Sequence, residues 1–229
     1  MKKYVQEATD INIWTSIKNN TFGRNKDIKE FIDGLELIDE SACISLDAKW
    51  GDGKTFFVRQ IEEVLKYVLA NQRADEENPI EKLPSYEYLK DNEMMAKIDL
   101  KHSYLPIYYN AWMYDNHSDP LMSLLLVMTK TCRGVYDTKI DSEKISKKLV
   151  EALATLPISL GEFKANPFTA IEKLQGKSMD ILSLVQTEEE IRERVKGIFN
   201  DIIVERAQKL VIFIDELDRC RPSFAIEML

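Results

Sequence analysis

Residues 45–55, which read SLDAKWGDGKT, constrain the fold more than any other stretch of the chain. A short apolar run before the glycines predicts a buried strand over 42–47. From residue 54 to about residue 71, apolar side chains recur at spacings of three and four, which predicts an amphipathic helix. A strand, a glycine-rich turn and a helix in this order are what a phosphate-binding loop requires.

The chemistry of such a loop rests mainly on its backbone. A tight glycine turn points several N–H groups into one cavity at the positive end of the next helix, where anions bind. On this interpretation Lys54 contacts the terminal phosphates and the Thr55 hydroxyl holds Mg²⁺. The residues expected to contact nucleotide are Trp50, Gly51, Asp52, Gly53, Lys54, Thr55 and Phe56. The usual pattern has glycine where this chain has Ala48, and alanine can serve there if its φ is negative. The alternative is a simple turn before a helix.

A second stretch, KLVIFIDE at 209–216, supplies what a phosphate loop lacks. Its five consecutive apolar residues predict a buried strand over 209–215. An aspartate at the end of such a strand, Asp215, can hold Mg²⁺ directly or through water, and Glu216 beside it can polarise an attacking water. Taken alone, the same residues also fit an ordinary core strand that ends in a turn. Together with the loop, they predict a nucleotide site that holds Mg²⁺.

The remaining pattern predicts a lead-in over 1–21 and a single domain over 22–229. A charged insertion is expected at 72–103 and a helical insertion at 140–208. The other expected elements are a short element at 11–17, a helix at 25–40, a helix near 86–95, a strand at 105–112, helices at 119–131 and 187–207, and a last helix starting near 224.

Composition limits the function classes. The formal net charge of −8 argues against a broad nucleic-acid surface. The three cysteines lie far apart, without metal-ligand spacing, and their odd number argues against a disulfide framework. No stretch approaches 18 apolar residues, so no membrane span is expected, and we expect a cytoplasmic protein.

Three further stretches suggest a family. Gly23-Arg24 precedes the helix at 25–40, as a Gly-Arg turn does in many ATPases of the additional-strand type. NAWMY at 110–114 and DELDRC at 215–220 follow the WGDGKT loop in order. With these motifs the chain resembles the KAP family of P-loop NTPases. The resemblance implies a three-layer α/β core with a mainly parallel sheet, incomplete at its C-terminal end because a later strand is absent.

The resemblance also implies binding and hydrolysis of ATP or GTP, in a protein of signalling or phage defence. It assigns phosphate and Mg²⁺ to Lys54 and Thr55 and the metal to Asp215. The water-activating base is Glu216 or Asp218. A homo-oligomer or a protein partner bound through the helical insertion is a further expectation. Two other functions stay open: an interaction module gated by nucleotide with little hydrolysis, and a structural domain with a decayed site.

Overall fold

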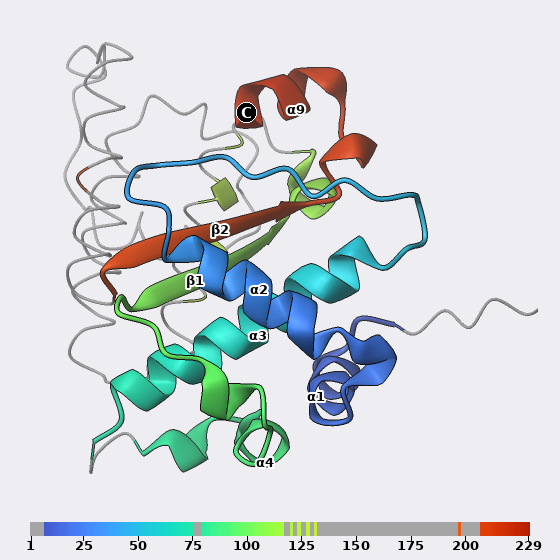
Figure 1. The fold of residues 1–229 in the computed structure, drawn as a ribbon. Helices are drawn as coiled ribbons and strands as arrows, with labels where there is room; N and C mark the ends of the chain where they lie inside the picture. Colours follow the sequence, from blue (N-terminus) through green and yellow to red (C-terminus); the bar gives the residue numbers. More distant parts are fainter. Residues whose placement is uncertain are drawn as a thin grey trace, which may run out of the picture. The chain divides into compact units, whose positions relative to one another are not determined.

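The computed structural model describes residues 7–75, 79–116, 207–229 and seven isolated positions between them, namely 120, 123, 124, 127, 128, 131 and 197. The chain forms two compact units. One contains residues 1–120 and 206–229, and the other contains residues 121–205. The fold below is that of the first unit, drawn in colour in Figure 1.

Two parallel strands form the sheet of this unit (Figure 1). Strand β1 spans Tyr104–Asn110 and β2 spans Lys209–Asp215. Their register pairs Tyr108 with Phe213 and the last residue of β1 with the last residue of β2. Because neighbours in register share a face, both strands deliver their final side chains to the same edge of the sheet. The prediction for β2 is confirmed at both ends.

Strand β1 ends two residues earlier than predicted. Asn110 accepts a hydrogen bond from the N–H of Met113 through its side chain, over 3.2 Å. This contact caps the short 3₁₀ helix η4 (Ala111–Tyr114) and turns the chain away from the sheet. The local capping by an asparagine thus overrides the aromatic, strand-like composition of the following residues.

Three helices carry most of the remaining fold. Helix α1 spans Asp10–Lys18, α2 spans Asn25–Leu35 and α3 spans Lys54–Gln72. The expected elements at 11–17 and from residue 54 are confirmed, whereas α2 is five residues shorter than the predicted 25–40. The shorter described elements are η1 (Thr21–Gly23), η2 (Ile80–Lys82), α4 (Tyr86–Leu89), η3 (Met95–Lys97), η6 (Leu217–Arg219) and α9 (Pro222–Met228).

The strand predicted at 42–47 is not present. Residues 41–50 are all exposed and none has strand structure, and Ile44 and Leu46 leave 53% and 41% of their surface in water. The chain just before this segment is held to β2, since Lys209 Nζ donates to the carbonyl of Ile38 over 2.8 Å. A strand needs a neighbour for its backbone N–H and C=O groups, and no described strand pairs with this segment. The prediction rested on composition and did not include that requirement.

The helix predicted near 86–95 is divided. Asn92 separates α4 from η3, and its side chain accepts from the N–H of Met94 while donating to the carbonyl of Ile17. Side chains that bond to nearby backbone in this way compete with a continuous helix. Six positions of the helix predicted at 119–131 are described, and each is helical: 120, 123, 124, 127, 128 and 131. The rest of that segment, most of the helix predicted at 187–207 and most of the helical insertion at 140–208 lie outside the described residues.

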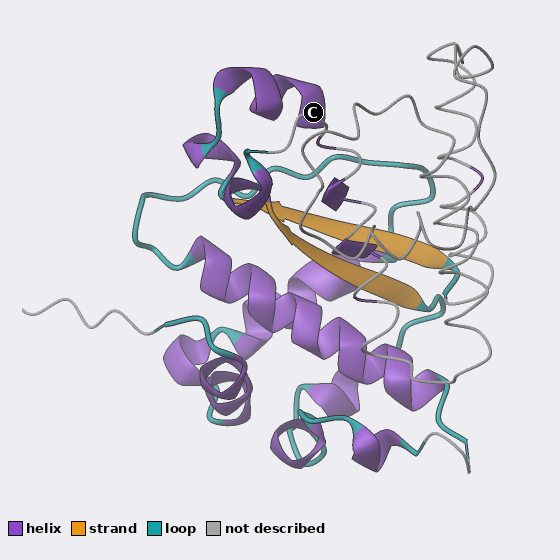
Figure 2. Ribbon diagram, turned by 180° about the vertical axis from the view of Figure 1, so that it is seen from behind, coloured by secondary structure: helices purple, strands orange, loops and turns teal. Residues whose placement is uncertain are grey.

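The core lies between the helices and one face of the sheet. Helix α3 packs on β1, while α1 and α2 pack on α3, as Figures 1 and 2 show from opposite sides. The buried residues of this core are Ile13, Ile17, Ile28, Ile32, Leu35, Ile61, Val64, Leu65, Leu89, Met94, Leu100, Tyr104 and Phe213. A parallel sheet flanked by helices confirms the α/β class, and the three-layer arrangement stays a prediction.

We expect Ile13→Ala to lower the free energy of unfolding by about 2–5 kcal/mol, because the residue is fully buried and alanine would leave a cavity. The matched control is Ile11→Ala on the same helix. Ile11 is 61% exposed, and its loss should change stability by less than about 0.5 kcal/mol. Urea unfolding of both variants measures the difference. Equal effects would show that α1 is not part of the folded core.

Candidate phosphate-binding loop and acidic strand end

The turn before α3 has the backbone that only glycine adopts readily. Gly51 and Gly53 have φ values of 90° and 83°, which are the positive φ values of the loop. Ala48 is not among the positive-φ residues of the described chain. The condition under which alanine can replace the usual glycine is therefore met. The turn is closed by Asp52, whose N–H donates to the Lys49 carbonyl and whose carboxylate accepts from the Lys49 N–H, each over 3.1 Å.

Arg24 holds the loop from outside. Its guanidinium donates to the carbonyls of Asp52 and Gly53, over 2.8 Å and 3.3 Å. A Cβ added at Gly53 would lie 3.2 Å from the Arg24 Nη1 atom, so the close approach depends on this glycine. The sequence indicated Arg24 only as part of a Gly-Arg turn. Its contact with the loop joins residues nearly thirty positions apart and has no local sequence signal.

Helix α3 begins directly at the loop. The first-turn N–H groups of a helix have no intrahelical acceptor, which leaves them for an anion. Lys54, the first residue, directs its ammonium across the loop, where Nζ donates to the Ala48 carbonyl over 2.6 Å. Thr55 follows in the first turn and is half-buried, Phe56 packs against the core, and Trp50 is 80% exposed. The structure thus gathers the predicted cationic and hydroxyl groups at one helix end.

Asp215 ends β2 with both carboxylate oxygens engaged. Oδ2 accepts a hydrogen bond from the Tyr108 hydroxyl and Oδ1 accepts one from the N–H of Glu216, each over 2.9 Å. Burial and the neighbouring carboxylate of Asp215 raise the pKa of Tyr108 far above its ordinary value, so its hydroxyl keeps its proton and donates. The role of Tyr108 was not predicted from the sequence.

Glu216 has a different side-chain partner from Asp215. Its backbone has φ 59° and ψ 26°, in the left-handed region, and its carboxylate forms an ion pair with Arg219 three residues later. Burial raises the pKa of Glu216, and the positive charge of Arg219 acts against that rise. Arg219 in turn lies 5.6 Å from the centre of the Trp112 ring. Asp218, the other expected base, is exposed.

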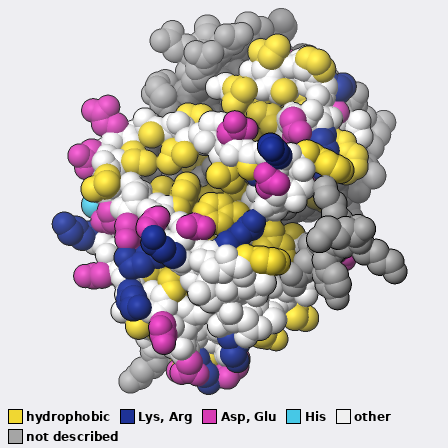
Figure 3. Space-filling model, turned by 45° about the vertical axis from the view of Figure 1, so that its right-hand side comes forward, with side chains coloured by type: hydrophobic (Ala, Val, Ile, Leu, Met, Phe, Trp, Pro, Cys, Tyr) yellow, Lys and Arg dark blue, Asp and Glu magenta, His cyan; other side chains and the backbone are white. Residues whose placement is uncertain are grey.

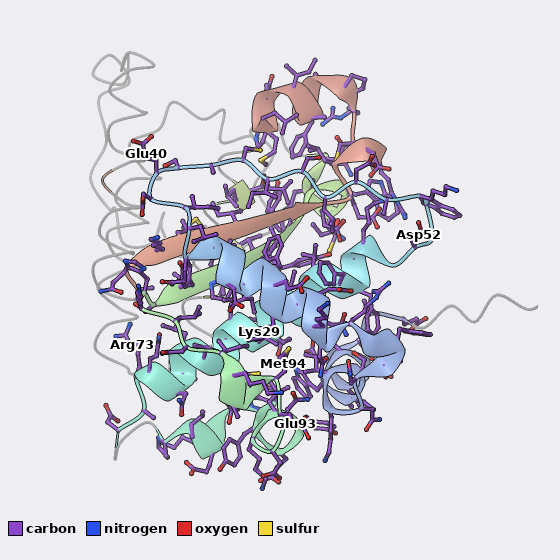
Figure 4. The ribbon with its side chains drawn as sticks, in the orientation of Figure 1. Lys29, Glu40, Asp52, Arg73, Glu93 and Met94 are labelled. Carbon is purple, nitrogen blue, oxygen red and sulfur yellow. The ribbon has the colours of Figure 1, made fainter. Side chains whose placement is uncertain are left out.

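The loop and the strand end are connected through α3. Arg59 lies one turn after Thr55 on the same helix face, and its guanidinium carbon lies 4.7 Å from the centre of the Tyr108 ring. Tyr108 then reaches Asp215. In Figure 4 the labelled Asp52 lies on the side of the molecule toward which both strands run. Both predicted halves of the site therefore belong to one region of the first unit.

A model of the KAP family P-loop domain matches residues 24–229, nearly the whole chain. The chain belongs to the KAP family of P-loop domains. Comparison with curated proteins and with solved structures gives no significant match. None of the described helices has the length and hydrophobicity that a membrane span requires.

The candidate site offers few protein ligands to a metal. Within the described ranges no three His, Cys, Asp or Glu side chains gather into a metal-binding group. Mg²⁺, however, is commonly held by one or two carboxylates together with water and substrate phosphates. Asp215 at the strand end and the Thr55 hydroxyl at the start of α3 fit that set of oxygen donors. These residues therefore fit a Mg²⁺ ion that is held jointly with substrate phosphates, and do not form a complete metal site by themselves.

Several large hydrophobic side chains of the loop segment and β2 are exposed. Figure 3 shows hydrophobic side chains gathered across one face of the molecule, with charged groups around them. The exposed large hydrophobic residues of the loop segment and β2 include Ile44, Leu46, Trp50 and Ile214. Phe22, beside the Gly-Arg turn, is 88% exposed and has a φ of 62°.

We expect Gly53→Ala to destabilise the KAP-family loop by about 1–2 kcal/mol, since alanine would adopt a left-handed conformation. The added methyl would also press on Arg24. The control is Gly34→Ala in α2, where an added Cβ meets nothing within 4 Å. That change should stabilise by up to about 1 kcal/mol through helix propensity. Thermal unfolding of the two variants should shift in opposite directions, and equal shifts would contradict the loop geometry.

Proposed function

We propose that this KAP-family chain binds ATP, or GTP, together with Mg²⁺ at the 48–55 loop and hydrolyses it. One observation carries the proposal: a glycine turn at positive φ, held by Arg24, leads into α3 with Lys54 at its first position. Backbone donors, a lysine and the helix dipole converge there, and a triphosphate is the ligand that uses all three.

Each residue has a role in this proposal. Lys54 leaves the Ala48 carbonyl and binds the terminal phosphates, while the amides of the first turn of α3 bind their oxygens. Thr55 and Asp215 would hold Mg²⁺, which would supply positive charge to offset that of the phosphates. Residues 50–56 would provide the remaining contacts to the nucleotide.

Glu216 is the better candidate for the base that receives the proton of the attacking water. It directly follows the metal-binding residue and is partly buried, whereas Asp218 is exposed. Its carboxylate must leave Arg219 before it can accept that proton. Binding and hydrolysis would therefore be coupled to a local rearrangement, and we propose that this rearrangement drives a conformational switch. The family resemblance extends the proposal to signalling or phage defence.

A second function is favoured by the same ion pair. If Arg219 holds Glu216 throughout, the chain binds nucleotide without hydrolysing it and acts as a nucleotide-gated interaction module. Its partner would be a second copy or another protein, bound through residues of the helical insertion. The two functions share the loop and differ in what Glu216 does.

We expect Lys54→Ala to weaken binding of a fluorescent ATP analogue in Mg²⁺ by roughly 10–100-fold, because one charge-assisted contact contributes about 1.5–3 kcal/mol. Lys49→Ala is the matched control, as it removes the same charge from the same loop. Within the described residues, Lys49 takes part in the loop's hydrogen bonds through its backbone N–H and carbonyl. Equal loss in both variants would indicate charge attraction without a specific site.

We expect Glu216→Gln to keep nucleotide binding and to lower phosphate release by about 10²–10⁴-fold, the usual contribution of a general base. Asp218→Asn should leave turnover within a few-fold of the unchanged protein. Steady-state phosphate release and binding are measured on the same samples. Full activity in Glu216→Gln with loss in Asp218→Asn would move the base to Asp218. No turnover by any protein that binds would favour the interaction module.

A further inference from the structure

The carboxylate of Asp215 is held from two sides. The Tyr108 hydroxyl donates to Oδ2 and the Glu216 N–H donates to Oδ1, both over 2.9 Å. One donor comes from the neighbouring strand and the other from the next residue of the chain. A carboxylate with one donor on each oxygen cannot rotate freely about its last torsion, and its remaining lone pairs keep a fixed direction.

Tyr108 is itself held in place. The guanidinium of Arg59 lies against its ring at 4.7 Å. Arg59 forms ion pairs with Glu62 on α3 and, over 2.9 Å, with Asp10 on α1. The arginine side chain is only 17% exposed, so these contacts are partly shielded from water. Tyr108 therefore presents its hydroxyl from a fixed ring and not from a mobile surface side chain.

This series of contacts reaches both halves of the site. Arg59 belongs to α3, whose first turn contains Thr55, and Tyr108 belongs to the strand beside β2. Every link between Thr55 and Asp215 is a helix turn, a ring contact or a hydrogen bond. The relative position of the hydroxyl and the carboxylate therefore depends on these links.

We propose that Tyr108 is a positioning residue that orients the Asp215 carboxylate for Mg²⁺, with Arg59 holding the tyrosine ring. The inference rests on the proposed function, because it needs Asp215 to bind the metal of a bound nucleotide. It goes beyond that function by assigning a role to a residue outside the loop and the acidic strand end. Hydrogen-bond partners of metal ligands typically affect metal affinity or activity by about 10–100-fold.

A purely structural role would give a different result. If the hydrogen bond only fastened β1 to β2, its loss would lower stability and would affect nucleotide binding equally with and without metal. If the hydroxyl orients Asp215, its loss should raise the Mg²⁺ requirement and leave metal-free binding unchanged. The dependence on Mg²⁺ therefore separates the two roles.

The experiment uses the full chain and a fluorescent ATP analogue, titrated with Mg²⁺ and separately bound in EDTA. Tyr108→Phe removes only the hydroxyl. We expect it to need about 10-fold more Mg²⁺ for half-maximal binding, with unchanged binding in EDTA. Tyr104→Phe is the matched control: it is the same change on the same strand and face, at the opposite end from Asp215. It should alter neither quantity.

A second variant, Arg59→Lys, tests the same inference without changing Tyr108. Arg59→Lys retains a positive charge near Glu62 and Asp10 but lacks the planar group that lies on the ring. We expect a smaller rise in the Mg²⁺ requirement, in the same direction. This variant decides the matter if Tyr108→Phe does not fold, as judged by circular dichroism.

The outcomes separate the inference from the proposed function. The proposed site stands if the unchanged protein shows Mg²⁺-dependent nucleotide binding that Lys54→Ala removes. If, in that case, Tyr108→Phe and Arg59→Lys keep the original Mg²⁺ requirement, the positioning role of Tyr108 is wrong. If the unchanged protein shows no Mg²⁺-dependent binding, the proposed site is wrong and the inference falls with it. A raised Mg²⁺ requirement in Tyr108→Phe that is absent from the Tyr104→Phe control supports the inference.

Discussion

Helix α3 packs along β1, and both the core and the candidate site depend on this one contact. Its buried residues, among them Ile61 and Leu65, fix the helix against the sheet. Its first residue, Lys54, is thereby fixed as well, because the helix continues without a break from the loop to residue 72. Hydrophobic burial in the middle of the helix therefore determines where the phosphate-binding end lies, although none of the buried residues contacts a ligand.

The same helix also carries charges into a poorly solvated region. Burial raises the pKa of Glu62, and the neighbouring cations Lys66 and Arg59 act against that rise. Glu63 accepts a hydrogen bond from the Trp14 indole over 2.6 Å and pairs with Lys66. Such buried groups are tolerated when each is paired, but removing one partner leaves an uncompensated charge. The Trp14–Glu63 hydrogen bond attaches α1 to the helix of the site, so that a segment before the family-matched region contributes to its support.

Much of this arrangement could be predicted from the sequence, because some elements are specified locally. Strand β2 and helix α3 have long apolar patterns and clear ends, and both predictions are confirmed. The strand at 42–47 was wrong because strand structure depends on a partner that composition cannot supply. The contacts of Arg24 with the loop and of Tyr108 with Asp215 join residues distant in sequence. Only the packing of α2, α3 and β1 brings these groups together, so no local pattern could have indicated them.

The two acids at the end of β2 differ because the backbone between them changes direction. Asp215 keeps strand geometry and faces Tyr108, whereas Glu216 has a positive φ, which costs a residue with a side chain about 1–2 kcal/mol. In that conformation the second carboxylate forms its ion pair with Arg219, whereas the first accepts from Tyr108. Two adjacent carboxylates on one side would repel each other and compete for the same cation. The turn at Glu216 thus gives the two adjacent acids separate partners. This separation would let Asp215 bind a metal while Glu216 accepts a proton.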